Sequence, residues 1–168
     1  MKLDSLQDVF EEQVSDLYDA EQQLLQALPK VAQAAGSDEL RTAITDHLEE
    51  TRGHVQRLEQ IFEAAGITRQ DERCEAMEGI LREGDEIVTA TGDPTAKDAA
   101  LIAAAQRVEH YEIAGYGTAR TLAGELGFSE AESLLEETLD EESKADKLLT
   151  KIATGGMLRS GINAKATN

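Results

Sequence analysis

The chain has little of what most folds use to organise a core. Among its 168 residues there is no tryptophan, one cysteine (Cys74) and two prolines, and only 4% of the residues are aromatic. A core must therefore be built from Leu, Ile, Val and Ala, and no disulfide can form within the chain. Because proline interrupts helices, its scarcity beside abundant Glu, Ala, Leu, Gln and Lys indicates an all-helical protein. A chain of this length is expected to form one domain.

Positive charge is scarce as well. The 16 Lys and Arg residues face 34 Asp and Glu residues, for a formal net charge of -18. Surfaces that bind DNA or RNA need clustered basic residues to displace counterions, so this balance argues against a nucleic-acid partner and against an anionic membrane. No apolar run approaches the ~20 residues that span a bilayer, and the first residues lack a continuous apolar signal segment. We therefore expect a cytoplasmic protein.

Four segments show the three-and-four spacing of apolar residues that marks one face of a helix. They span roughly residues 5–34, 37–65, 94–126 and 129–154. Asp93 followed by Pro94 predicts the start of the third helix, because Asp caps free amides and proline suits the first helical position. Ser129 and Glu132 have the spacing of a capping box, which predicts the start of the fourth helix.

The connections between these segments also carry signals. Gly36 is expected to end the first helix in a left-handed conformation, and Gly66 and Gly127 follow the second and third helices. Residues 67–92 predict a short amphipathic helix across the outside of the bundle, in a connection long enough to join opposite ends, as in ferritin-like topologies. Residues 1–156 are thus predicted to form one bundle domain. The tail, 157–168, has little periodicity and is expected to be frayed or to form an oligomer contact.

Each apolar face is interrupted near its middle by charged or ionisable residues. The interruptions are Glu21 in the first helix, His47, Glu50 and His54 in the second, Glu109 and Glu112 in the third, and Glu142 and Asp146 in the fourth. Helices of similar length that pack side by side share a mid-plane, so these side chains should meet in one layer. Burying unpaired carboxylates is costly, so such a layer needs cations.

The charge of this layer favours two metal ions over one. Five carboxylates and one or two imidazoles would repel one another, and two divalent cations would roughly balance them. We predict a dinuclear site with the ligands Glu21, Glu50, His54, Glu109, Glu112 and Glu142. This oxygen-rich set suits iron or manganese and does not exclude zinc, calcium or magnesium. Di-iron bundles use Glu-x-x-His on two helices, whereas Glu50 and His54 are four residues apart and the fourth helix has no histidine.

Five further residues are polar or reactive, and two of them have two possible roles. His47 is either a ligand or a group that orients Glu50, and Asp146 is either a ligand or part of a solvated acidic face. His110 lies off the core-facing positions and is read as a surface or interface residue. Tyr116 is read as a core residue whose hydroxyl bonds to a carboxylate, and Cys74 as a packing residue, because a reactive thiol needs basic neighbours.

Four stretches are distinctive as sequence: HLEET at 47–51, CEAMEG at 74–79, AALIAAAQ at 99–106 and VEHYEIA at 108–114, with weaker support from LYDAE at 17–21. Through them, and over nearly its whole length, the chain resembles the YciF-like family of bacterial ferritin-like stress proteins. The resemblance implies a ferritin-like four-helix bundle with an added short helix between the second and third long helices. It also implies a dinuclear metal centre, a homodimer and a link to stress responses.

Two functions from different classes stay open. In the first, the metal site reacts with dioxygen or peroxide, as a di-iron or di-manganese oxidoreductase of the ferroxidase, peroxidase or catalase type. In the second, bound metal only stabilises the bundle of a non-catalytic stress protein whose acidic surface mediates association. A structural site should be closed by saturating ligands, whereas mixed carboxylate sets resemble open, redox-capable sites. An iron-storage cage is a third, weaker hypothesis.

Overall fold

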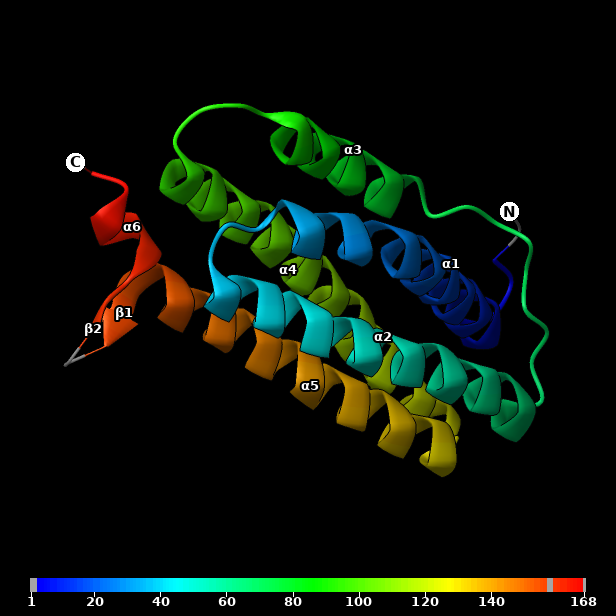
Figure 1. The fold of residues 1–168 in the computed structure, drawn as a ribbon. Coiled ribbons are helices and arrows are strands. Elements are labelled where there is room, and N and C mark those ends of the chain that lie inside the picture. The colour runs from blue at the N-terminus through cyan, green and yellow to red at the C-terminus, as the bar shows by residue number, and fades with distance from the viewer. Residues whose placement is uncertain (1–2, 157–158, 168) are drawn as a thin grey trace.

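The structure is a computed structural model that describes residues 3–156 and 159–167 (Figure 1). Its elements, in chain order, are α1 (Leu6–Ala34), α2 (Asp38–Ala65), α3 (Glu75–Thr89), α4 (Pro94–Leu126), α5 (Ser129–Thr154), β1 (Gly155–Gly156), β2 (Arg159–Ser160) and α6 (Ile162–Lys165). The prediction of an all-α protein with four long helices and a short helix in the connection is confirmed. Among the described residues, no helix has both the length and the hydropathy needed to cross a membrane.

The four long helices form a bundle in which α1 and α5 each pack against both α2 and α4. Figure 1 shows that α2 and α4 run in the same direction, because the segment that contains α3 returns the chain from one end of the bundle to the other. α3 itself lies outside the bundle, against α1 and α4. The α1–α4 and α2–α5 faces therefore lie on opposite sides of the molecule, and only the former is covered by an extra helix.

Most helix ends follow the local signals in the sequence. Asp93 caps α4 by accepting a hydrogen bond from the amide of Ala96, and Gly66 and Gly127 end α2 and α4 with φ of 65° and 76°. The expectation for Gly36 was wrong, since its φ is not positive and α1 ends at an extended Ala35.

A distant carboxylate explains the difference at the end of α1. Asp98 on α4 is 3% exposed and accepts hydrogen bonds from the backbone amides of Gly36 and Ser37, both at 2.8 Å. It therefore satisfies donors in the turn between α1 and α2 that the extended backbone leaves free. A residue about sixty positions away in sequence thus decides the conformation of this turn.

The predicted capping box at the start of α5 was also wrong. Ser129 is already helical, the N-cap is Phe128, and no side chain caps the helix. The ring of Phe128 packs against Phe10 with their centroids 5.6 Å apart. The carboxylate of Glu132 lies beside Gly124, where an added Cβ would be 3.1 Å from Oε1. Aromatic packing, and not a local hydrogen bond, fixes this end of α5.

The apolar core is divided into two clusters by a polar layer. Members of the first cluster include Leu24, Leu28, Leu40, Ile44, Leu101, Ile102 and Leu149. Members of the second include Phe10, Val14, Leu17, Leu58, Ile61, Tyr116 and Leu135. Between them lie six buried ionisable side chains, so each half has an apolar core of its own. They are Glu21, His47, His54, Glu109, Glu112 and Glu142.

Gly115 allows α1 and α4 to approach closely beside this layer. A Cβ at Gly115 would be 2.8 Å from Cδ2 of Leu17, whereas a Cβ at Gly117 would be 4.0 Å from Cδ2 of Leu139, an ordinary contact. The first glycine is therefore required by packing, while the second is not. Close packing of α1 on α4 therefore depends on Gly115.

The C-terminal segment is not frayed where the structure describes it. β1 and β2 pair in an antiparallel ladder, and Ile162 of α6 is 4% exposed and packs against the first core cluster. The expectation of a loose tail was therefore wrong for residues 159–167. Residues 157, 158 and 168 lie outside the described part of the chain, and a role of the tail in an oligomer stays a prediction.

Candidate metal centre

Six ionisable side chains are buried together at mid-height of the bundle. They are Glu21 on α1, His47 and His54 on α2, Glu109 and Glu112 on α4, and Glu142 on α5, each 5% exposed or less. His47 and His54 lie on one face because seven residues make nearly two helical turns. The prediction that ionisable groups of four helices meet in one layer is thus confirmed.

Their atoms form two groups, each of a size that could hold a metal ion. The larger group consists of His47, Glu109, Glu112 and Glu142, and in each group one ligand atom from every member lies within 4.8 Å of the others. Nε2 of His47 lies 3.6 Å from Oε1 of Glu109 and 3.8 Å from Oε2 of Glu142. One imidazole and three carboxylates thus converge on a common point.

The smaller group consists of Glu21, His54 and Glu142. Nδ1 of His54 lies 2.9 Å from Oε1 of Glu142 and 3.2 Å from Oε1 of Glu21. Tyr116 donates a hydrogen bond of 2.5 Å from its hydroxyl to Oε1 of Glu21, as the sequence suggested. Because Glu142 belongs to both groups, its two oxygens can serve two neighbouring positions.

Glu50 lies outside both groups, although it was predicted as a ligand. Its side chain is 47% exposed, and its Oε2 lies 3.5 Å from Nδ1 of His47. On helix α2 it is set off from the line that joins His47 and His54, so it reaches the edge of the layer and not its centre. This contact fits the alternative role of His47, which is to orient Glu50. His47 is at the same time a member of the larger group. Ligation by Glu50 stays a prediction.

Asp146 and His110 pair with each other at the surface of the α4–α5 face. Nε2 of His110, whose side chain is 69% exposed, lies 3.3 Å from Oδ1 of Asp146. Asp146 also accepts a hydrogen bond of 2.9 Å from Nε2 of Gln106. Neither belongs to the two groups, so the surface reading of His110 is confirmed, and the structure favours the solvated reading of Asp146.

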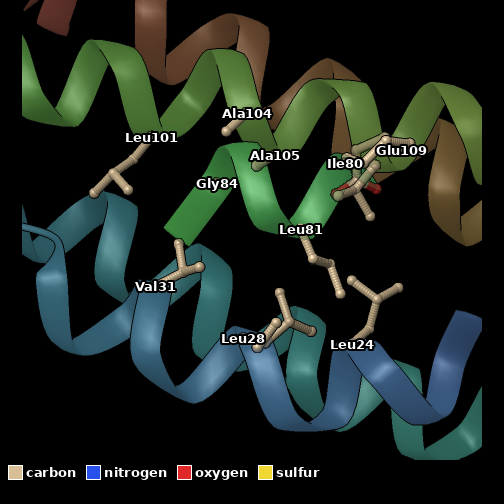
Figure 2. A pocket seen from close by; sticks show the side chains of 12 residues that line it. Leu24, Leu28, Val31, Ile80, Leu81, Gly84, Leu101, Ala104, Ala105 and Glu109 are labelled. Atoms are coloured by element: carbon tan, nitrogen blue, oxygen red, sulfur yellow. The ribbon is translucent and has the colours of Figure 1, made fainter. Parts of the chain in front are cut away.

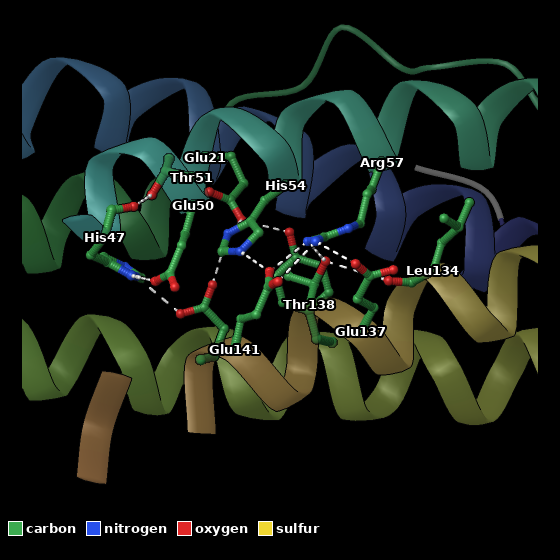
Figure 3. Close-up of polar contacts among 12 residues, drawn as sticks. Glu21, His47, Glu50, Thr51, His54, Arg57, Leu134, Glu137, Thr138 and Glu141 are labelled. Atoms are coloured by element: carbon green, nitrogen blue, oxygen red, sulfur yellow. Dashed lines mark hydrogen bonds and ion pairs between the residues drawn. The ribbon is translucent and has the colours of Figure 1, made fainter. Parts of the chain in front are cut away.

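The outward nitrogen of His54 is held by a pair of residues that sequence reasoning missed. Nε2 of His54 lies 3.0 Å from Oε2 of Glu141, and Arg57 forms two bonds to the same carboxylate, at 2.6 and 2.9 Å (Figure 3). Arg57 is also bonded to Glu137 at 2.8 Å. Carboxylates in this position fix the orientation and basicity of a metal-binding histidine. Arg57, three residues after His54 and so on the same side of the helix, was the available signal.

The pKa values of the histidines follow from this environment. Burial lowers the pKa of His47, but the nearby Glu109 and the other carboxylates outweigh this and raise it to about 9. Burial likewise lowers the pKa of His54, but Glu142 and Glu21 raise it to about 10. In the metal-free protein both imidazoles are therefore cationic at neutral pH and partly neutralise the carboxylates around them.

The carboxylates divide into two kinds. Burial raises the pKa of Glu109 well above its ordinary value, and burial with the neighbouring carboxylates does the same for Glu112. Burial alone would also raise the pKa of Glu142, but the imidazole of His54, whose Nδ1 lies 2.9 Å from Oε1, and the charge of His47 lower it overall. The surroundings thus favour the neutral form of Glu109 and Glu112 and the charged form of Glu142.

Many atoms of the layer have no hydrogen-bond partner. Within residues 3–156 and 159–167, nine buried side-chain nitrogen and oxygen atoms lack one, and all belong to Glu21, His47, His54, Glu109, Glu112 and Glu142. Buried polar atoms normally find partners, because leaving one unpaired costs about 1–3 kcal/mol. Carboxylate oxygens and imidazole nitrogens are the ligand atoms of iron, manganese and zinc. The donor set therefore fits bound cations.

A polar cavity leads from the surface to this layer. It has a volume of about 180 Å³ and lies on the α2–α5 face, with Asp46, Glu50 and Lys144 at its charged part and His47 and Glu109 at the layer. Its other walls are apolar, from Ala43, Ile44, Ala145, Leu148 and Leu149. The larger group can therefore be reached by a hydrated ion, whereas His54 is fully buried behind Glu141 and Arg57.

Comparison with known proteins finds relatives that match nearly the whole chain. Protein YciF of Escherichia coli (strain K12) is 44% identical over 169 residues, which cover 100% of this chain and 99% of that protein. The crystal structure of the E. coli stress protein YciF superposes with a TM-score of 0.87 at 46% identity, covering 89% of this chain and 94% of that chain.

Two other solved structures are similar. YcfI from Rhodopseudomonas palustris has a TM-score of 0.86 at 39% identity, over 91% of this chain and 99% of that chain. A protein from Xanthomonas campestris, at 20% identity and a TM-score of 0.68 over 87% of this chain and 88% of that chain, shares the fold. Residues 5–166 match the family described as domain of unknown function DUF892. The chain therefore belongs to the DUF892 family, to which the resemblance to YciF-like proteins had pointed.

Proposed function

We propose that the chain is a ferritin-like protein that binds two divalent metal ions at the polar layer and uses them to oxidise ferrous iron or to consume dioxygen or peroxide. The observation that carries this proposal is the pair of ligand groups that share Glu142. Two neighbouring positions joined by one carboxylate are the arrangement of di-iron and di-manganese bundles. Iron is the proposed metal and manganese the alternative, because oxygen ligands outnumber nitrogen ligands.

The residues of the chain have separate tasks in this proposal. Bound iron or manganese supplies the redox electrons. His47 with Glu109 and Glu112, and His54 with Glu21, hold one position each, and Glu142 spans both. Glu141 accepts a hydrogen bond from Nε2 of His54, which directs Nδ1 inward, and Tyr116 donates a hydrogen bond that fixes one oxygen of Glu21. The aliphatic clusters on either side of the layer exclude water.

Protein purified without a chelating tag tests the proposal. Elemental analysis should give close to two metal ions per chain. Anaerobic titration with ferrous iron, followed by stopped-flow mixing with dioxygen or peroxide, should show metal-dependent consumption of one of them. If neither oxidant is consumed by the metal-loaded protein, the redox function is excluded.

A second candidate function is favoured by the unpaired atoms of the layer. Because nine buried polar atoms have no hydrogen-bond partner among the described residues, bound metal would stabilise the bundle whether or not it turns over. In this alternative the chain is a non-catalytic structural or interaction protein. Chelation would then lower the melting temperature, while the stopped-flow experiment would show no reaction with either oxidant.

We also propose that the chain is a cytoplasmic homodimer. The resemblance to the YciF-like family supports this, and Leu148 on α5, which is 44% exposed, is an apolar surface residue of a kind that a second copy can cover. Light scattering coupled to a sizing column should give twice the mass of 18.2 kDa. A monomer would refute the dimer, and a shell of many subunits would favour iron storage instead.

A further inference from the structure

A second cavity reaches the polar layer from the opposite face of the bundle. It lies beneath α3, between α1 and α4, and has a volume of about 30 Å³. Its walls are aliphatic, and Figure 2 shows Leu81 of α3 pointing toward Leu28 and Leu24 of α1. Among the described residues that line it, Glu109 is the one that is ionisable. The cavity therefore joins an apolar region directly to a side chain of the larger ligand group.

The size and lining of this cavity restrict what it can hold. A cavity needs about 10–15 Å³ to hold one water, and a water needs two to four polar partners. Aliphatic walls supply no such partners, so this space suits an uncharged apolar molecule of very few atoms. An ion would lose its hydration shell there without compensation.

The polar cavity on the α2–α5 face differs from the cavity beneath α3 in the charge of its lining. Both cavities are lined by Glu109, but only the polar one has Asp46, Glu50 and Lys144 around it. Ions and hydrated oxidants such as peroxide thus have a polar approach on one face. The approach on the other face is left to a molecule that partitions into hydrocarbon.

We propose that the cavity beneath α3 is a binding site for dioxygen, placed beside Glu109. The identity of the occupant rests on the proposed function, since dioxygen is the small apolar oxidant that a metal centre of this kind would use. The existence of a site for small apolar molecules rests only on the volume, the aliphatic walls and the position of Glu109. α3, which lies outside the four-helix bundle, supplies the outer wall.

Dioxygen itself is the probe for the first experiment, because it is paramagnetic. In metal-free protein under dioxygen pressure, with nitrogen pressure as the blank, the methyl groups of Leu24 and Leu101 should relax faster than those of Leu58 and Leu135. All four side chains are buried to within 1% of full burial, so depth alone does not separate them. Equal relaxation enhancement in the two pairs would overturn the proposal.

Variants of α3 connect the effect to the cavity. Gly84 lines the cavity, and a Cβ there has no heavy atom within 4 Å, so Gly84→Leu should fold and fill the space. Gly79→Leu is the matched control, since Gly79 is on the same helix with equally free surroundings and does not line the cavity. The excess relaxation should be lost in the first variant and kept in the second. Its full retention in Gly84→Leu would refute the assignment.

A second variant fills the cavity from the other wall. Ala105→Leu on α4 should also abolish the faster methyl relaxation of Leu24 and Leu101. Ala103→Leu, at an exposed position of the same helix, should leave that relaxation unchanged. In metal-loaded protein, Gly84→Leu should slow the reaction with dioxygen and leave that with peroxide unchanged. Equal slowing of both would contradict the division between the two faces. A wild-type protein that binds dioxygen but consumes no oxidant would refute the proposed function and leave this site standing.

Discussion

The two ligand groups share Glu142 but differ in what surrounds their histidines. His54 is fully buried, its outward nitrogen is bonded to Glu141, and Arg57 holds that carboxylate in turn. His47 lies 3.5 Å from a half-exposed Glu50 and lines the polar cavity. One position is enclosed by bonded neighbours, and the other is open to solvent on one face and to an apolar cavity on the other.

This difference would let one layer retain bound metal at one position and admit ions or oxidants at the other. A histidine fixed by a bonded carboxylate gives a rigid ligand. A histidine beside a polar cavity gives a position that an incoming ion or oxidant can reach. We therefore assign metal retention to the enclosed group and exchange to the open group, and the following predictions test that division.

The largest effect is expected from Glu142→Ala, because this residue belongs to both groups. Metal content should fall from about two ions per chain to below one, whereas Glu21→Ala and His47→Ala should each remove about one. Elemental analysis of equally purified samples measures this. Asp140→Ala, which removes an exposed carboxylate from the same helix, is the control and should keep both ions. A Glu142 variant with full metal content would show that the groups are independent.

The stability of the metal-free protein and its affinity for metal should change in opposite directions as the pH rises. The pKa values of about 9 for His47 and about 10 for His54 are raised above the ordinary 6.5, so this stabilisation is complete below about pH 6.5 and is lost as pH rises through those values. The raised pKa values of Glu109 and Glu112 act in the same direction. The melting temperature of metal-free protein should therefore fall between about pH 6 and about pH 10.

Metal binding should strengthen over the same interval, because ligands must lose their protons before they bind. Proton release on metal addition, measured by titration in weak buffer, provides the second readout. A metal-free protein whose melting temperature stays level, or metal binding without proton release, would contradict the assigned protonation states.

Loosening the enclosed group should weaken one ion selectively. Arg57→Gln removes the two bonds that hold Glu141 against His54, and changes of this kind usually cost about 10–100-fold in metal affinity. Glu50→Gln, beside the open group, should instead alter the rate of metal uptake. Competition with a chromophoric chelator measures both quantities. The comparison between the two groups would break down if Arg57→Gln left both affinities unchanged.

The smallest effect concerns the packing of α1 on α4 beside the layer. Gly115→Ala should destabilise the protein by about 1–3 kcal/mol, because its Cβ would be 2.8 Å from Leu17. Gly117→Ala meets only an ordinary contact at 4.0 Å and should stabilise the helix by up to about 1 kcal/mol. Urea unfolding of the metal-free proteins measures the difference, and equal signs for the two substitutions would refute this account of Gly115.

The helices and the polar layer were predictable because both depend on local periodicity. Spacing along one helix places His47 and His54 on a common face, and the caps at Asp93, Gly66 and Gly127 act within a single turn. The same logic placed Glu21, Glu109, Glu112 and Glu142 at mid-height before any contact was known. Such features need no knowledge of which helix is the neighbour.

The features that sequence reasoning missed depend on partners far along the chain. Asp98 caps the turn at Gly36 from another helix, and Phe128 is held by Phe10. The local signals at the end of α1 and at the start of α5 therefore gave wrong predictions. Glu141 looked like part of a solvated acidic run until Arg57 and His54 were placed beside it. Membership of His47 in the larger group, and the exposed position of Glu50, likewise required the arrangement of α2 against α4 and α5.

The polar layer also has a consequence for how the bundle opens. Since it separates two hydrocarbon clusters, each end of the molecule has its own packed interior, and the backbones of the long helices and whatever cations occupy the middle connect them. Amide exchange measured end by end can therefore report whether the two ends loosen independently or together. Metal bound at the proposed site would join the two local opening reactions into one and would so set the cooperativity of unfolding of the whole bundle.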